Sequence, residues 1–241
     1  MRTRIVSVAP LLALLIAACG GGGGKSSSTT SAPSTTAASA SSATTLGTDE
    51  AAIAQGKKLV FVQSDFPAGW TATASGNSPE DKATNKQLDA CIGTSGDEAK
   101  SADVKGDDFN MGQGTQVSSE AQIVKSEATY HADVAAVKGP KLQSCLQDFV
   151  TKGLTKAVGS APASVQLTDF SVPSYGDVTI GKRMTAALTA QGQTINVVVD
   201  FVLMAKSKAE VTASFTNLGQ PFDPALETSL INKLGTRVKE S

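Results

Sequence analysis

The sequence has little of what metal centres and histidine-dependent catalytic sites are made of. Its 241 residues include one histidine, three cysteines and one tryptophan. His131 has no second histidine or cysteine at ligand spacing, so we expect no metal site. Asp133 lies two residues further on and therefore on another face of a helix, which favours a solvated histidine over a catalytic pair.

Sequence motifs of enzyme active sites are also missing. No G-x-S-x-G nucleophile elbow occurs in the chain. The glycine run at 20–24 and the segment GQGTQ at 112–116 do not lie between a predicted strand and a predicted helix, so they do not indicate a phosphate-binding loop. We therefore expect a protein that is not an enzyme, with no catalytic residue and no cofactor.

Neither sign of charge is in excess. Lysine and arginine total 21, aspartate and glutamate total 22, and the formal net charge is −1. No basic block or stripe of basic and aromatic residues follows the chain, and such a stripe is the usual footprint of a protein that binds nucleic acid. Nucleic acid is therefore excluded as an expected partner.

The N-terminus has the layout of an export signal. Arg2 and Arg4 precede a mainly apolar run at 5–16, and the small residues Ala17 and Ala18 follow it. The run is shorter than the ~20 residues that a helix needs to cross the hydrocarbon core of a bilayer. We therefore predict a signal peptide at residues 1–18 and export from the cytoplasm.

The residues at the end of this signal, Ile16-Ala17-Ala18-Cys19, resemble the lipobox of bacterial lipoproteins. The resemblance implies that Cys19 receives a diacylglycerol and becomes the new N-terminus after cleavage. Two acyl chains anchor a protein stably, whereas one holds it only marginally. We expect the mature protein on the extracytoplasmic face of the cell membrane, which it contacts through its lipid anchor. The alternative is an ordinary secretory signal in which Cys19 occurs by chance.

Residues 19–47 form the predicted tether. Almost all of them are glycine, serine, threonine or alanine, and such small side chains cannot bury a core. A disordered linker of this kind reaches on the order of 30 Å. Residues 48–241 are then one extracytoplasmic domain, which is long enough to bury its own core.

Two cysteines remain once Cys19 carries lipid. Cys91 and Cys145 form an even pair in an exported chain, which predicts a disulfide. Closing a loop of this length would stabilise the fold by about 4 kcal/mol. The alternative is two buried free thiols.

The first two thirds of the domain give mixed patterns. The segment 57–73 predicts a strand, a turn and a short strand, and a short helix at 85–92 should carry Cys91 inward. Period-two alternation at 115–124 predicts a strand with one packed face, and helices are expected at 128–137 and from Pro140 onwards. The second of these helices has one apolar stripe that should face the core, formed by Leu142, Cys145, Leu146, Phe149 and Val150.

The last third has the clearest pattern. Extended runs at 164–172, 178–190, 194–205 and 209–215 are joined by short connections, which predicts a four-stranded antiparallel meander. Asp223 and Pro224 then begin a helix whose leucines recur every four residues. The predicted class is α+β, with helices packed on an antiparallel sheet.

Several of these segments resemble a known family. SDFPAGW at 64–70, a cysteine in each of two helical segments, YGD at 175–177 followed by Arg183, and the closing helix resemble the extracytoplasmic domains of actinobacterial lipoproteins and PknH-type receptor kinases. The resemblance covers about residues 59–238 and implies a PsbP-like sandwich. At the hairpin where that family often has glycine, this chain has Lys206-Ser207-Lys208.

Other polar and aromatic residues have ordinary structural explanations. Asp65, Asp177 and Asp200 lie at strand ends or within predicted strands, where we expect turn-forming or solvent-facing carboxylates. Trp70 is expected to fill the core. The sequence singles out no ligand-binding residue.

Three functions fit these features. The family resemblance implies a sensor or binding module of the cell envelope, with an envelope lipid, glycan or protein bound in a groove between sheet and helices. A lipid or glycolipid carrier would require a large apolar cavity. A structural envelope protein would bind another protein along an open sheet edge or an exposed patch.

Overall fold

The computed structural model describes residues 44–46, 49–75, 79–112, 114–158, 164–190 and 193–241. The predicted signal peptide, Cys19 and most of the predicted tether lie outside these ranges. The tether was expected to extend to residue 47, but Thr44–Leu46 forms the first strand, β1, which pairs with the strand at 100–105. The folded domain therefore begins before residue 48.

The described strands form one antiparallel sheet of nine strands. Its main path runs β1-β3-β5-β9-β8-β7-β6, and β4 pairs with both β2 and β5. The strands after β1 are β2 (Thr71–Thr73), β3 (Lys100–Lys105), β4 (Asp108–Met111), β5 (Thr115–Val124), β6 (Ser164–Asp169), β7 (Val178–Ala190), β8 (Gln193–Lys206) and β9 (Ala209–Leu218). The last four strands are neighbours in sequence and in the sheet, so the predicted meander is confirmed.

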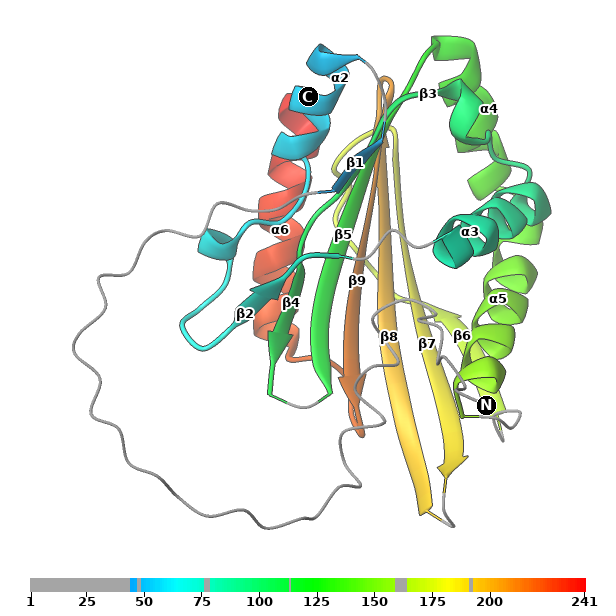
Figure 1. The fold of residues 1–241 in the computed structure, drawn as a ribbon, viewed down its shortest axis with the longest axis vertical. Helices are drawn as coiled ribbons and strands as arrows, with labels where there is room; N and C mark the ends of the chain where they lie inside the picture. The colour runs from blue at the N-terminus through cyan, green and yellow to red at the C-terminus, as the bar shows by residue number, and fades with distance from the viewer. Residues whose placement is uncertain (1–43, 47–48, 76–78, 113, 159–163, 191–192) are drawn as a thin grey trace.

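Helices cover both faces of the sheet (Figure 1). One face carries α2 (Glu50–Lys58) and α6 (Pro224–Glu240), and the other carries α3 (Pro79–Ile92), α4 (Glu127–Val137) and α5 (Lys141–Val158). Short 3₁₀ helices occur at Gln63–Asp65 and Asp97–Ala99. The predicted α+β class is confirmed.

The main core lies between the sheet and α6. The alternation predicted for β5 is observed, because Val117, Ala121 and Ile123 are buried against this core. Trp70 packs against Phe66 and Phe222 and is 6% exposed, so its predicted place in the core is confirmed. These side chains hold the loop before β2 against the helical layer.

The closing helix forms as its sequence predicts. The Asp223 side chain accepts a hydrogen bond from the Leu226 backbone N–H at 2.7 Å and caps the helix. Leu230, Leu234 and Val238 are buried on one face of α6. The cap and the apolar stripe together fix where the helix begins and which side meets the sheet.

The segment before Trp70 differs from the prediction. The chain is helical up to Lys58, and Leu59 to Phe61 are buried without forming a strand. The Phe61 N–H donates instead to the Ser119 side chain at 2.8 Å. The backbone hydrogen bond of this short apolar run is made with a residue far away in the sequence. The pattern of residues within the run therefore cannot show whether it forms a strand.

Two carboxylates expected at turns or in solvent are buried. Asp200 is 0% exposed, and both of its carboxylate oxygens accept hydrogen bonds from Arg183, at 2.7 and 2.6 Å. Asp65 is also buried and pairs with Arg237 of α6 at 2.6 Å. Both carboxylates differ from the prediction for the same reason. In each case an arginine elsewhere in the sequence compensates the buried negative charge. Asp177 is exposed, as expected.

The β8–β9 hairpin contains a backbone conformation that favours glycine. Ser207 has a φ of 52° in the connection between the two strands. We expect Ser207→Gly to raise the free energy of unfolding by about 0.5–1 kcal/mol, because glycine adopts this conformation without steric cost. Urea unfolding would measure the change. Lys208→Gly is the matched control and should lower stability; if it stabilises equally, loop flexibility and not the φ angle of residue 207 explains the result.

Candidate functional site

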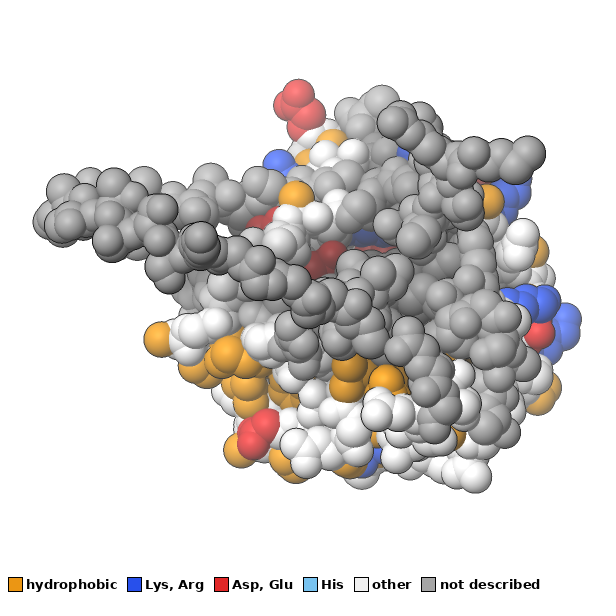
Figure 2. Space-filling view, turned by 60° about the horizontal axis from the view of Figure 1, so that its bottom comes forward, with side chains coloured by type: hydrophobic (Ala, Val, Ile, Leu, Met, Phe, Trp, Pro, Cys, Tyr) orange, Lys and Arg blue, Asp and Glu red, His pale blue; other side chains and the backbone are white. Residues whose placement is uncertain are grey.

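A cavity of about 370 Å³ lies between the sheet and the helical layer formed by α3 and α5. Its walls come from α3, α4, α5 and strands β3, β4, β5, β7, β8 and β9. Figure 2 shows hydrophobic side chains gathered in the lower part of one face of the molecule, with acidic and basic side chains recessed above them. The residues that line the cavity have the same division into an apolar part and an acidic part.

The floor of the cavity can be read from the strand registers. Ser118, Ser214, Phe201 and Lys182 lie opposite one another across β5, β9, β8 and β7. The next row consists of Glu120, Thr212, Leu203 and Ile180. The floor is therefore polar over β5 and β9 and largely apolar over β8 and β7.

The roof over the apolar half comes from α5. Leu142, Leu146, Val150 and Leu154 are buried and line the cavity, which confirms the apolar stripe. Phe149 was predicted to be a core residue, but it is only half-buried and also lines the cavity. Phe149 lies on the same stripe of α5, but its side chain faces the cavity and not a filled core.

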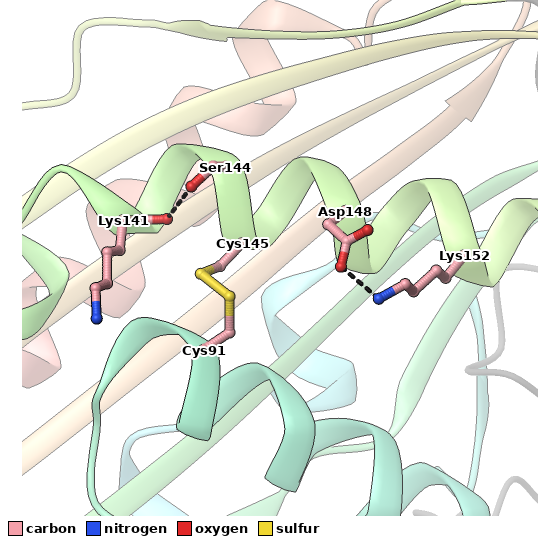
Figure 3. The surroundings of a disulfide bond; sticks show 6 residues. All are labelled: Cys91, Lys141, Ser144, Cys145, Asp148 and Lys152. Atoms are coloured by element: carbon pink, nitrogen blue, oxygen red, sulfur yellow. Dashed lines mark hydrogen bonds and ion pairs between the residues drawn. A yellow bond between two sulfur atoms is a disulfide. The ribbon is translucent and has the colours of Figure 1, made fainter.

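A disulfide joins the two helices of the roof (Figure 3). Cys91 of α3 and Cys145 of α5 are bonded, with their Cα atoms 5.8 Å apart. Cys145 is buried, but Cys91 is exposed, so the expectation that α3 carries Cys91 inward is wrong. The bond therefore ties α3 to α5 from the outer side of the helical layer.

The polar half of the cavity contains more carboxylates than cations. The lining includes two lysines, Lys105 and Lys182, and five carboxylates, Asp89, Asp108, Glu120, Asp133 and Glu210. Most of the carboxylates are compensated by neighbouring groups, but Oε1 of Glu210 is buried without a hydrogen-bond partner among the described residues. The cavity thus carries local negative charge although the whole chain is nearly neutral.

Burial raises the pKa of several of these groups. Loss of solvent is the largest cause for Asp108 and for Glu210, and each pKa rises to about 7. The Asp133 carboxylate adds to the effect at Glu210. Asp103 lies beside the cavity on β3, and burial followed by repulsion from Glu120 raises its pKa to about 7 as well. These groups bind protons near neutral pH.

The raised pKa values predict an unusual dependence of stability on pH. A carboxyl whose pKa is about 7 in the fold and about 4 in the unfolded chain favours folding below pH 4, and this contribution is lost as the pH rises through 7. We expect the free energy of unfolding to be higher at pH 5 than at pH 8, by on the order of 1 kcal/mol for each of Asp103, Asp108 and Glu210. Urea unfolding at both pH values tests this.

The control for this prediction removes the titrating groups. Asp108→Asn combined with Glu210→Gln should stabilise the protein at pH 8 and flatten the dependence between pH 5 and 8. A midpoint that rises towards pH 8 in the wild-type protein would contradict the proposed burial of these carboxyls.

Within the described ranges, no group of three or more histidine, cysteine, aspartate or glutamate side chains could hold a metal ion. His131 is exposed on α4 and contacts the Tyr130 ring. None of the helices within the described part of the chain is both long and apolar enough to span a bilayer. The cavity itself has an apolar part and a polar, acidic end.

Sequence reasoning missed the residues of this cavity. The signal was present in β5, because the alternation that buries Val117 and Ala121 leaves Ser118, Glu120 and Gln122 on the opposite face. Such a face usually contacts solvent. Its role depends on α3 and α5 covering it, and nothing within the strand predicts that.

Comparisons with known proteins add little to this geometry. No protein-family model and no curated protein sequence matches the chain. Among solved structures, the chain is similar to LpqN, which is involved in cell envelope biogenesis of Mycobacterium tuberculosis, with a TM-score of 0.25 and 7% sequence identity over 73% of this chain and 78% of that chain. A likeness at this level supports no assignment of fold family or function.

Proposed function

We propose that this protein is a lipid-anchored, non-enzymatic module of the cell envelope that binds an amphipathic ligand in the cavity between α3, α5 and the sheet. The observation that carries the proposal is the division of one cavity into two chemically different halves. Phe201, Met184 and Leu146 line the apolar half, whereas Glu120, Thr212 and Ser214 line the polar half. A ligand with an apolar body and a polar end matches both.

The size of the cavity limits the ligand. At about 370 Å³ it lies at the lower end of the range of small-molecule sites. If a methylene group occupies about the 30 Å³ of a liquid water, roughly a dozen such groups fill it. The cavity therefore suits one alkyl chain or a small apolar ring system, and it is too small for the several chains of a large glycolipid.

A carrier of single-chain amphiphiles is the second candidate, because it would use the same cavity. A protein-binding structural role has less support. Within the described residues, Met111 is the one large hydrophobic side chain that is well exposed, at 38%, so a protein-docking surface would have to use side chains that are half-buried. The family resemblance to PsbP-like sensor domains also remains a proposal, and it agrees with ligand binding between sheet and helices.

Anchoring at Cys19 is the other part of the proposal. Cys19→Ser should abolish incorporation of radiolabelled palmitate, because without a thiol no diacylglycerol can be attached. The variant should also keep its signal peptide. Membrane fractionation with palmitate labelling measures both. A processed, labelled Cys19→Ser protein that still fractionates with membranes would overturn the anchor.

Native mass spectrometry of the full-length protein, purified from the membranes in which it is produced, tests the cavity. We expect an added mass that organic extraction releases. Thr212→Trp should remove it, because Thr212 lies on the cavity floor and tryptophan would fill the space. Thr185→Trp, at an exposed position of β7 outside the cavity lining, should keep it. An added mass that is absent, or present equally in both variants, would contradict the proposed function.

A further inference from the structure

Two buried carboxyl groups share one cation on the face of the sheet that α6 covers. Asp200 of β8 is 0% exposed, and Glu227 in the first turn of α6 is 6% exposed. Arg183 of β7 lies opposite Asp200 in the strand register. Its guanidinium donates to both Asp200 oxygens, whereas its Nη2 lies 4.0 Å from Oε2 of Glu227, too far for a hydrogen bond. One positive charge therefore faces two buried carboxyl groups.

The Glu227 carboxyl is poorly placed to be ionised. Its Oε1 is buried without a hydrogen-bond partner among the described residues. Asp223, one turn earlier on α6, is exposed and caps the helix, and the charged groups that face Glu227 are Asp200 and Arg183. Burial, followed by repulsion from Asp200, raises the pKa of Glu227 to about 8. A proton on Glu227 removes one of the two negative charges and donates a hydrogen bond to Asp200.

The two halves of α6 are held to the rest of the domain by different charged contacts. In the C-terminal half, Arg237 pairs with Asp65 at 2.6 Å, and Lys233 donates to the Asp65 backbone carbonyl at 2.6 Å. In the N-terminal half, the charged contact is that of Glu227 with the buried arginine–aspartate pair of the sheet. A buried carboxylate without a donor is unfavourable, so ionisation of Glu227 weakens the N-terminal half and leaves the C-terminal contacts in place.

We propose that Glu227, Asp200 and Arg183 form a pH-sensitive switch, in which a proton held between the two carboxyl groups keeps the N-terminal half of α6 on the sheet and loss of that proton to water releases it. The folded-state pKa lies above the ordinary value, so the contribution to stability is complete in acid and is lost as the pH rises through about 8. Phe201, the neighbour of Asp200, lines the cavity on the opposite face of the sheet. The switch is therefore independent of the proposed ligand binding.

Trp70 fluorescence reports on this half of α6. Trp70 is the one tryptophan of the sequence, and its ring centroid lies 6.0 Å from that of Phe222, two residues before α6 begins. When the full-length protein is titrated from about pH 6 to about pH 9, we expect the emission to move to longer wavelength with a midpoint near pH 8, because release of the helix end admits water to the ring. The β-rich circular dichroism spectrum should not change, which separates local release from unfolding.

Three variants assign the titration to one carboxyl group. Glu227→Gln keeps the shape of the side chain and stays neutral, so its emission should be constant over the whole range. Glu240→Gln is the matched control, because it removes an exposed carboxyl group at the other end of the same helix, and it should titrate as the wild-type protein does. Asp108→Asn removes a carboxyl group whose pKa is about 7 and should also keep the shift near pH 8.

Carbon-13 NMR of the Glu227 carboxyl in the wild-type protein follows the proton directly and should give the same midpoint as the fluorescence. A Glu227 signal that titrates below about pH 6 would overturn the shared proton. If Glu227 titrates near pH 8 while Trp70 emission stays constant, the helix is not released and the switch is wrong. The switch is also wrong if Glu227→Gln shifts as the wild-type protein does, or if the circular dichroism signal is lost at the same midpoint.

Discussion

Arg183→Met is expected to lower the free energy of unfolding by about 3–5 kcal/mol, because it leaves the Asp200 carboxylate buried without a cation. Asp200 is 0% exposed and receives both of its arginine hydrogen bonds from this one side chain. Glu227 of α6 lies next to the pair, and burial followed by repulsion from Asp200 raises its pKa to about 8. Glu227 in its protonated form hydrogen-bonds to Asp200, but it is neutral and cannot replace the positive charge of Arg183. Urea unfolding measures the change.

Two comparisons isolate the cause of that effect. Lys152→Met breaks an exposed ion pair with Asp148 and should cost less than about 0.5 kcal/mol. In an Asp200→Asn background, Arg183→Met should cost far less than in the wild-type protein, because no buried charge is left without a partner. Equal costs in the two backgrounds would mean that the arginine stabilises the fold through packing over Phe170, with which it makes a cation–π contact.

Removal of the disulfide should have an effect of similar size. The bond closes a loop with a sequence separation of 54 residues, and the chain-entropy model assigns such a loop about 4 kcal/mol. We expect the double variant Cys91→Ser with Cys145→Ser to keep its β-rich circular dichroism spectrum and to unfold at a much lower urea concentration. The main core, between α6 and the sheet, does not include either cysteine.

Reductant provides the control for the disulfide. Dithiothreitol should lower the unfolding midpoint of the wild-type protein to that of the double variant and leave the double variant unchanged. A free thiol that can be alkylated at Cys91 in the native protein, where the side chain is exposed, would contradict the bond.

The parts of the fold that could be predicted are those whose pattern is local and long. Strands β7, β8 and β9 have at least 10 residues each and follow one another through short connections, so periodicity was sufficient. The helix α6 has a cap, an N-terminal proline and a repeated apolar stripe. In such segments the local preferences agree with the tertiary structure.

The missed parts depend on contacts between distant segments. Strands β3 and β4 have 6 and 4 residues, too few for a pattern to stand out, and their position is fixed by pairing with β5. The burial of Asp200 depends on Arg183 of the neighbouring strand, directly opposite in the register. The cavity could not be predicted, because it exists only where α3 and α5 cover a polar sheet face without filling the space above it.

A methyl NMR titration of the full-length protein with decanol tests the central claim, that this cavity binds the apolar body of a ligand. We predict saturable shifts of the methyl groups of Leu146, Leu154 and Met184, which line the cavity, and none for Leu230 and Leu234, which lie in the core on the other face. Thr212→Trp should abolish the shifts. If the cavity methyl groups do not shift, or if Leu230 and Leu234 shift equally, the claim is wrong.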